Sequence, residues 1–98
     1  LGSPMFDTAY FLAGSLASDQ RKACERDLIA RHQSAIAARD PSYSLDRALA
    51  DYAAALPFAL FTTVGAATVI PPGEHSDELL MTLLRRNVEA LIDWNVFP

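Results

Sequence analysis

The sequence predicts an all-α fold with four helices in one domain that spans residues 1–98. Apolar residues recur at three- and four-residue steps over long stretches, and no segment shows the apolar–polar alternation of a half-buried strand. Helix-stopping segments, Asp40-Pro41 and Pro71-Pro72-Gly73, separate these stretches. A length of 98 residues leaves room for one small domain at most.

The first predicted helix runs from about Asp7 to Ala17, with Asp7 as a favourable N-cap. Because it is apolar almost all round, we expect it to be buried. The second runs from about Asp19 to Arg39, with Ser18 as N-cap. Its predicted apolar stripe consists of Cys24, Leu28, His32, Ala35 and Ile36. Its opposite face carries the charged residues Arg21, Lys22, Glu25, Arg26 and Arg31.

The third predicted helix follows Ser44, a candidate N-cap, and holds its apolar period as far as Ile70. From Ala53 onward its other face is apolar too, so we expect the central buried helix, kinked at Pro57. The fourth helix starts after Ser76. Its predicted stripe consists of Leu80, Leu83, Leu84, Val88, Leu91 and Ile92.

Composition narrows the class of partner. The net charge of −4 and the scattered basic residues argue against nucleic acid, which needs clustered Lys and Arg. One cysteine, Cys24, cannot form a disulfide within the chain, and this favours a reducing cytoplasm. No stretch is apolar enough to predict a membrane span. Hydrophobic residues make up 51% of the chain and crowd Phe6–Leu16 and Leu91–Phe97, so we expect it to pack against a further protein segment.

The residues alone predict no catalytic centre. His32 and His75 lack the partners of a metal site, and the glycines are too isolated for a phosphate-binding loop. Asp46 and Asp51 lie on one helix but face different directions, so paired carboxylate catalysis is not indicated.

One segment points further. Residues 6–16, Phe-Asp-Thr-Ala-Tyr-Phe-Leu-Ala-Gly-Ser-Leu, resemble the D-x-x-Y-F-L-x-x-S-L segment of aminoglycoside-phosphotransferase-like kinases, and most closely their ecdysteroid-kinase-like (CHK-type) branch. Tyr43-Ser44 followed by Asp51-Tyr52 is similar to the family's Y-S…D-Y element. The resemblance covers nearly the whole chain and is weakest after Pro71.

The resemblance implies that residues 1–98 form the C-terminal helical subdomain of a bilobal kinase-like phosphotransferase. Such enzymes transfer the γ-phosphoryl group of ATP, bound with Mg²⁺, to a small-molecule hydroxyl. The family's catalytic loop, H-[GN]-D-x-x-x-x-N, and its metal-binding I-D-[WF] motif precede the matching segment, and neither occurs here. We therefore expect no catalytic, cofactor or metal residue in this chain. Its implied partners are the N-terminal remainder of the kinase and a hydroxyl acceptor, which the resemblance does not name.

Four residues receive roles from the resemblance. The Asp that matches Asp7 braces the catalytic loop in the family, in addition to any capping of its own helix. The later helices help to wall the acceptor pocket, and this makes Asp51, Tyr52 and Phe58 candidate substrate contacts. Simple core or surface roles are the alternative for these three.

Two other classes stay open. One is a non-catalytic helical ligand-binding or dimerisation module, such as the effector half of a transcriptional regulator, with Phe58, Phe61 and Val64 as pocket or dimer face. The other is a purely structural oligomerisation bundle.

Overall fold

The computed structural model describes residues 4–96, which form four helices and no strand. These are α1 (Phe6–Ser15), α2 (Ser18–Ala37), α3 (Leu45–Ala67) and α4 (Glu74–Asp93). The predicted all-α class is therefore confirmed over this part of the chain. Phe97, at the end of the second predicted apolar stretch, lies outside the described residues.

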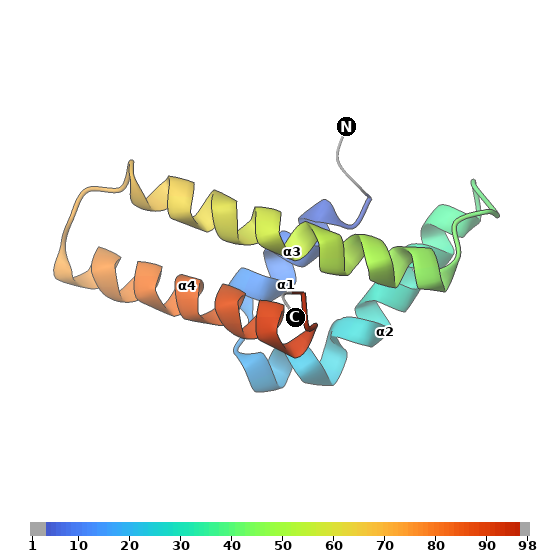
Figure 1. The fold of residues 1–98 in the computed structure, drawn as a ribbon, viewed down its shortest axis with the longest axis horizontal. Coiled ribbons are helices and arrows are strands. Elements are labelled where there is room, and N and C mark those ends of the chain that lie inside the picture. The colour runs from blue at the N-terminus through green and yellow to red at the C-terminus, as the bar shows by residue number, and fades with distance from the viewer. Residues whose placement is uncertain (1–3, 97–98) are drawn as a thin grey trace.

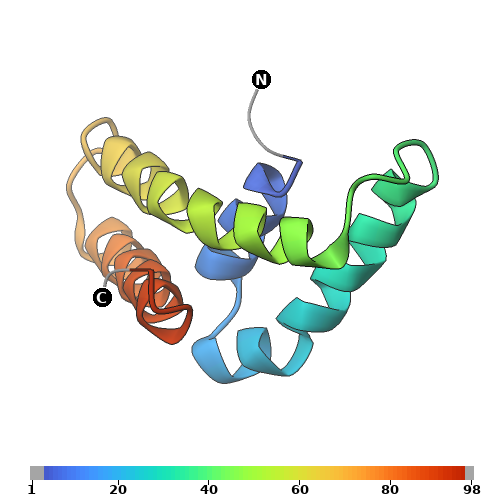
Figure 2. The same ribbon diagram turned by 45° about the vertical axis from the view of Figure 1, so that its right-hand side comes forward.

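Helices α3 and α4 lie side by side and run in opposite directions (Figure 1). They are joined by a loop at one end of the molecule and form a helical hairpin. Helix α1 crosses this hairpin on one side and makes its most extensive contacts with α3. Helix α2 diverges from the hairpin toward the start of α3 (Figure 2). The resulting shape is elongated, with extents of 48 × 28 × 25 Å.

The core is built largely from alanines and a few large side chains. Small residues let helix backbones approach closely, and this suits the α1–α3 crossing. Leu12, Leu56 and Tyr52 fill the space between the helices and are almost completely buried. The buried apolar residues are Met5, Ala9, Leu12, Ala13, Ile29, Tyr43, Ala48, Tyr52, Ala55, Leu56, Ala59, Ala90 and Leu91.

The predicted N-caps of the first two helices are wrong. Helix α1 begins at Phe6 with Met5 as N-cap, because Pro4 and Met5 form a turn that leads directly into it. Asp7 therefore lies in the first turn, where its charge still favours the helix dipole. Helix α2 begins at Ser18 itself, and the Ser18 hydroxyl donates to Glu89 Oε1 at 2.7 Å and does not cap its own helix.

The start of α3 is as predicted, because the Ser44 side chain accepts a hydrogen bond from the Arg47 N–H at 3.1 Å. Pro57 lies inside this helix. The helix ends at Ala67, short of the predicted Ile70, because Thr68, Val69 and Ile70 are β-branched and precede Pro71.

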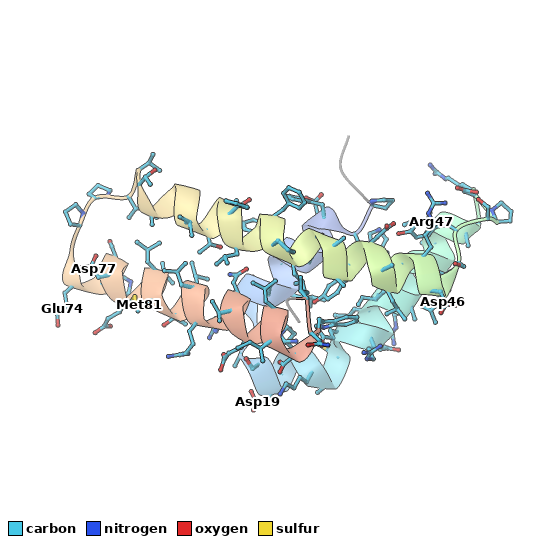
Figure 3. The ribbon with its side chains drawn as sticks, viewed as in Figure 1. Asp19, Asp46, Arg47, Glu74, Asp77 and Met81 are labelled. Carbon is cyan, nitrogen blue, oxygen red and sulfur yellow. The ribbon has the colours of Figure 1, made fainter. Side chains whose placement is uncertain are left out.

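Helix α4 begins earlier than predicted, at Glu74, with Gly73 as N-cap. The Asp77 N–H donates to the Gly73 carbonyl at 2.8 Å and closes the first turn. Glu74 and Asp77 both lie in this turn, at the end of the hairpin (Figure 3). Their charges favour a helix N-terminus, so a side-chain cap is not needed.

The apolar stripe predicted for the second helix is also wrong. The buried residues of α2 are Arg21, Glu25 and Ile29, whereas Leu28 and Ala35 are exposed. The helix is turned so that an ion pair faces inward. This orientation is possible because both Nη atoms of the Arg21 guanidinium donate to carboxylates, although its Nε–H is buried without a partner.

Two helices are less buried than predicted. In α1, Tyr10 and Phe11 are exposed, and in α3, Phe58 and Phe61 are exposed. By length and composition α3 is also long and apolar enough for a membrane span, contrary to the prediction from the sequence. Core helices of soluble proteins pass the same test, but they are mostly buried, whereas 33% of the most apolar window of α3 is buried here. Each of these helices therefore has one face packed and one face open.

Candidate functional site

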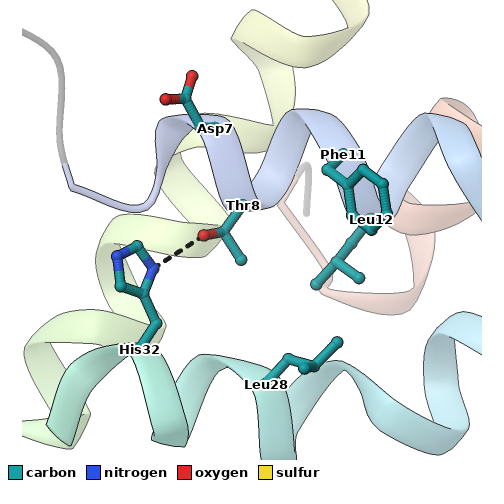
Figure 4. Close-up of a pocket in the computed structure, with 6 residues that line it drawn as sticks. All are labelled: Asp7, Thr8, Phe11, Leu12, Leu28 and His32. Carbon is teal, nitrogen blue, oxygen red and sulfur yellow. Dashed lines mark hydrogen bonds between the residues drawn. The ribbon is translucent and has the colours of Figure 1, made fainter. Parts of the chain in front are cut away.

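The segment that resembles the kinase family forms one wall of an open hollow of about 370 Å³ between α1 and α2 (Figure 4). The Thr8 Oγ1 atom and the His32 Nδ1 atom lie 2.9 Å apart and form a hydrogen bond across it. Its lining is mainly apolar and comprises Asp7, Thr8, Phe11, Leu12, Leu28 and His32.

Asp7 stands at the rim of this hollow. Its side chain is exposed, and Figure 4 shows the carboxylate directed away from His32 and Leu28. One turn later Phe11 is 58% exposed, whereas Leu12 beside it is buried. Helix α1 thus has an inner side that packs on α3 and an outer side that carries the exposed Asp7 carboxylate and the rings of Tyr10 and Phe11.

The three candidate acceptor contacts do not converge. The Tyr52 side chain is buried, and its hydroxyl donates to Glu25 Oε2 at 2.9 Å. The Asp51 carboxylate accepts from the Tyr43 hydroxyl at 2.9 Å. Phe58 is 58% exposed and tilts against the ring of Phe6, with the centroids 6.4 Å apart. The structure therefore places one candidate in the core, one in a local hydrogen bond and one at the surface.

A buried ionic network is the most developed polar feature of the fold, and the sequence reading missed it. The Arg21 guanidinium is fully buried, and its Nη1 atom donates to both oxygens of Glu25 at 2.9 and 3.0 Å. Its Nη2 atom donates to Asp93 at the end of α4. Lys22 lies 3.4 Å from the other Asp93 oxygen. Since Tyr52 also bonds Glu25, the network ties α2, α3 and α4 together.

Aromatic contacts extend this network. The Trp94 ring packs on Tyr52 with centroids 4.9 Å apart, and the Arg26 guanidinium lies over the same indole at 4.5 Å. Burial would raise the pKa of Asp93, but the hydrogen bond and charge of Arg21 outweigh it and lower the pKa. Burial, together with the negative charge of Glu25, raises the pKa of Tyr52. Asp93 therefore stays ionised and Tyr52 stays protonated at neutral pH, as the network needs.

One sequence signal pointed to this network. Arg21 and Glu25 are spaced to pair on one helix face, but such pairs are usually solvent-exposed. The partner at Asp93 is distant in sequence, so periodicity along α2 alone could not reveal it.

The described residues offer little for a metal or nucleophilic site. Residues 4–96 contain no cluster of three or more His, Cys, Asp or Glu side chains able to hold a metal ion. Cys24 is a half-buried free thiol. The Thr8–His32 pair has no carboxylate hydrogen-bonded to the imidazole among the described contacts, so the geometry supports binding and packing in preference to nucleophilic chemistry.

No family model, no curated protein and no solved structure matches this chain.

Proposed function

We propose that this chain is the C-terminal helical part of an ATP-dependent small-molecule kinase, which transfers the γ-phosphoryl group of ATP to a substrate hydroxyl. In this proposal α1 supports the catalytic loop, and α3 and α4 help to wall the acceptor pocket. The nucleotide and its metal are bound, in this proposal, by the remainder of the kinase.

The observation that carries the proposal is the two-sided character of α1. The residues that match the family segment include an exposed carboxylate, Asp7, and two exposed aromatic rings, Tyr10 and Phe11. Exposed aromatic side chains beside an apolar hollow are typical of a surface that another protein segment covers. A catalytic lobe packed on this side would cover the rings and bring its loop to Asp7.

The chemical role of Asp7 follows from its position. An exposed carboxylate in the first helical turn is free to accept backbone N–H bonds from a neighbouring loop, and charged acceptors make such bonds strong. Phosphoryl transfer depends mainly on positioning and charge neutralisation, so a loop displaced by about 1 Å loses much of its rate. Asp7 is therefore a positioning residue in this proposal and not a catalytic one.

The test uses the chain together with the protein segment that precedes it. The proposal expects that segment to carry the H-[GN]-D-x-x-x-x-N and I-D-[WF] motifs and the whole protein to phosphorylate hydroxyl compounds with ATP. Asp7→Asn should lower kcat by about tenfold or more, because a neutral amide accepts the loop hydrogen bonds less strongly, while the melting temperature stays nearly unchanged.

Asp46→Asn is the matched control, since Asp46 is also an exposed acid in the first turn of a helix, far from the hollow. Equal activity of both variants would remove the role of Asp7. A preceding segment without an acidic magnesium ligand would remove the kinase proposal altogether.

A further inference from the structure

The α3–α4 hairpin has a second apolar face that the other helices leave uncovered. Thr63 is only 4% exposed and lines a hollow with the α1 residues Tyr10 and Gly14, whereas Phe61, two positions earlier, is 73% exposed. Two positions on a helix differ by about 200°, so these side chains lie on nearly opposite sides. We call the outer side the hairpin face, formed by Pro57, Leu60, Phe61, Val64, Val88 and Ile92.

The two helices contribute to this face jointly. One hollow of about 240 Å³ lies along α3 at Pro57, Leu60, Phe61 and Val64. A second, of about 210 Å³, lies between Leu60 and the α4 residues Val88, Leu91 and Ile92. Because Leu60 lines both, the hollows adjoin and form a ridged apolar surface that a pair of helices fits.

The α3 half of the face carries no charge, although the chain is acidic, whereas on α4 the charged residues Arg85 and Glu89 lie three positions before Val88 and Ile92, respectively. No Asp, Glu, Lys, Arg or His occurs between Tyr52 and Gly73, while the net charge of the chain is −4. Two copies of an acidic protein repel each other where their charged surfaces meet. Along the α3 half of the hairpin face, two copies can therefore meet without opposing like charges.

The area is also close to what a dimer needs. Ile92 is 70% exposed, Val64 47% and Val88 43%, in addition to Phe61. With typical side-chain areas, the face offers on the order of 400–500 Å² per copy. Two copies would thus bury about 1,000 Å², near the lower end for a specific interface. Interfaces of this size are typical of weak and transient association.

We propose that the hairpin face is a self-association surface, on which a second copy of this chain packs its own α3 and α4. The arrangement is isologous, so each copy presents the same residues to the other. In the assembly, α3 and α4 become the inner layer between α1 on one side and the partner's hairpin on the other. This inference uses neither Asp7 nor the outer side of α1, and it concerns α3 and α4, which the kinase proposal gives to the wall of the acceptor pocket.

Sedimentation equilibrium of the 98-residue chain from about 1 to 500 µM tests the proposal. The expected result is a monomer–dimer equilibrium within that range. Phe61→Glu should raise the dissociation constant at least tenfold, because it places a charge in an apolar interface. Ile92→Glu on α4 provides an independent second variant. Both side chains are at least 70% exposed, so circular dichroism should show unchanged helix content.

The matched control is Phe11→Glu, a similarly exposed phenylalanine on α1, which should leave the dissociation constant unchanged. A chain that stays monomeric at every concentration overturns the proposal. So does a dimer that Phe11→Glu disrupts and Phe61→Glu does not. Vesicles of neutral phosphatidylcholine provide the last arm: a monomer that sediments with them through Phe61 would assign the face to a membrane and overturn the proposal.

Discussion

The Arg21 guanidinium lies in the core, at a place where an aliphatic side chain would avoid the cost of desolvation. Burying an unpaired charge costs several kcal/mol, and only close partners offset it. Arg21 has two such partners, Glu25 on its own helix and Asp93 on α4. Its hydrogen bonds to Asp93 and Glu25 outweigh burial and raise the pKa of the guanidinium. The network therefore specifies which side of α2 faces the core.

Arg21→Leu should destabilise the fold strongly. The substitution leaves Glu25, only 5% exposed, without its cationic partner. Removing one member of a buried ion pair typically costs about 3–5 kcal/mol. Urea unfolding followed by circular dichroism measures the change. In the double variant Arg21→Leu/Glu25→Leu no buried charge is stranded, and part of the loss should be recovered. A single variant as stable as the parent chain would show that the network is not formed.

Tyr43 gives the fold a defined alkaline limit. Burial raises the pKa of Tyr43 to about 12, and its hydrogen bond to Asp51 acts in the same direction. The pKa of an unfolded tyrosine is about 10, so the stabilisation is complete below pH 10 and is lost as pH rises toward 12. Unfolding free energy measured from pH 8 to 12 should fall over that interval. In Tyr43→Phe the fall should be smaller, and an identical profile would contradict this assignment.

At the level of the helices, the stability of the N-terminus of α3 depends on the side chain of Ser44. Ser44→Ala removes the acceptor for the Arg47 N–H and should cost about 1 kcal/mol of unfolding free energy. Ser44→Asp retains an acceptor oxygen and adds a favourable charge, so it should match or exceed the stability of the parent chain. Thermal melts of the parent chain, Ser44→Ala and Ser44→Asp measure these differences in stability. If Ser44→Ala is as stable as the parent chain, the cap does not contribute to stability.

The comparison of α2 with α3 explains how far the sequence could predict the fold. In α3 the apolar period and the Ser44 cap are local signals, and the helix start follows from them. In α2 the buried face carries Arg21 and Glu25, so a pattern of apolar residues pointed to the wrong side. Their compensation comes from Asp93, and a contact between distant helices leaves no periodic trace.

The same reason limits the prediction of the candidate site. Asp7 was identified from a segment of contiguous residues, and it lies at the rim of a hollow. Asp51 and Tyr52 were identified from local similarity, but their contacts are set by tertiary packing. The buried Tyr52 hydroxyl donates a hydrogen bond to Glu25, and the Tyr43 hydroxyl donates one to the Asp51 carboxylate. Local similarity in the sequence therefore does not predict which way a side chain points when tertiary packing sets its contacts.

At the scale of the whole molecule, the elongated shape leaves apolar surface on two sides. Helix α1 covers one side of the hairpin, but its own outer side and the hairpin face remain open. Apolar patches of this size on a monomer are often interaction sites. Both proposals follow from this, one for each side.

The dye 8-anilinonaphthalene-1-sulfonate should therefore bind the natively folded chain at a protein concentration well below the dissociation constant of the dimer. Phe11→Glu and Phe61→Glu should each lower the fluorescence enhancement, and their effects should add because the two rings lie on different sides. A partly unfolded chain also binds this dye, so near-ultraviolet circular dichroism serves as control. Trp94 packs on Tyr52 and should give a fixed aromatic signal in all variants. If the chain melts sharply and keeps that signal but does not enhance the fluorescence of the dye, it has no uncovered apolar surface. This outcome would exclude both the outer side of α1 and the hairpin face as docking surfaces.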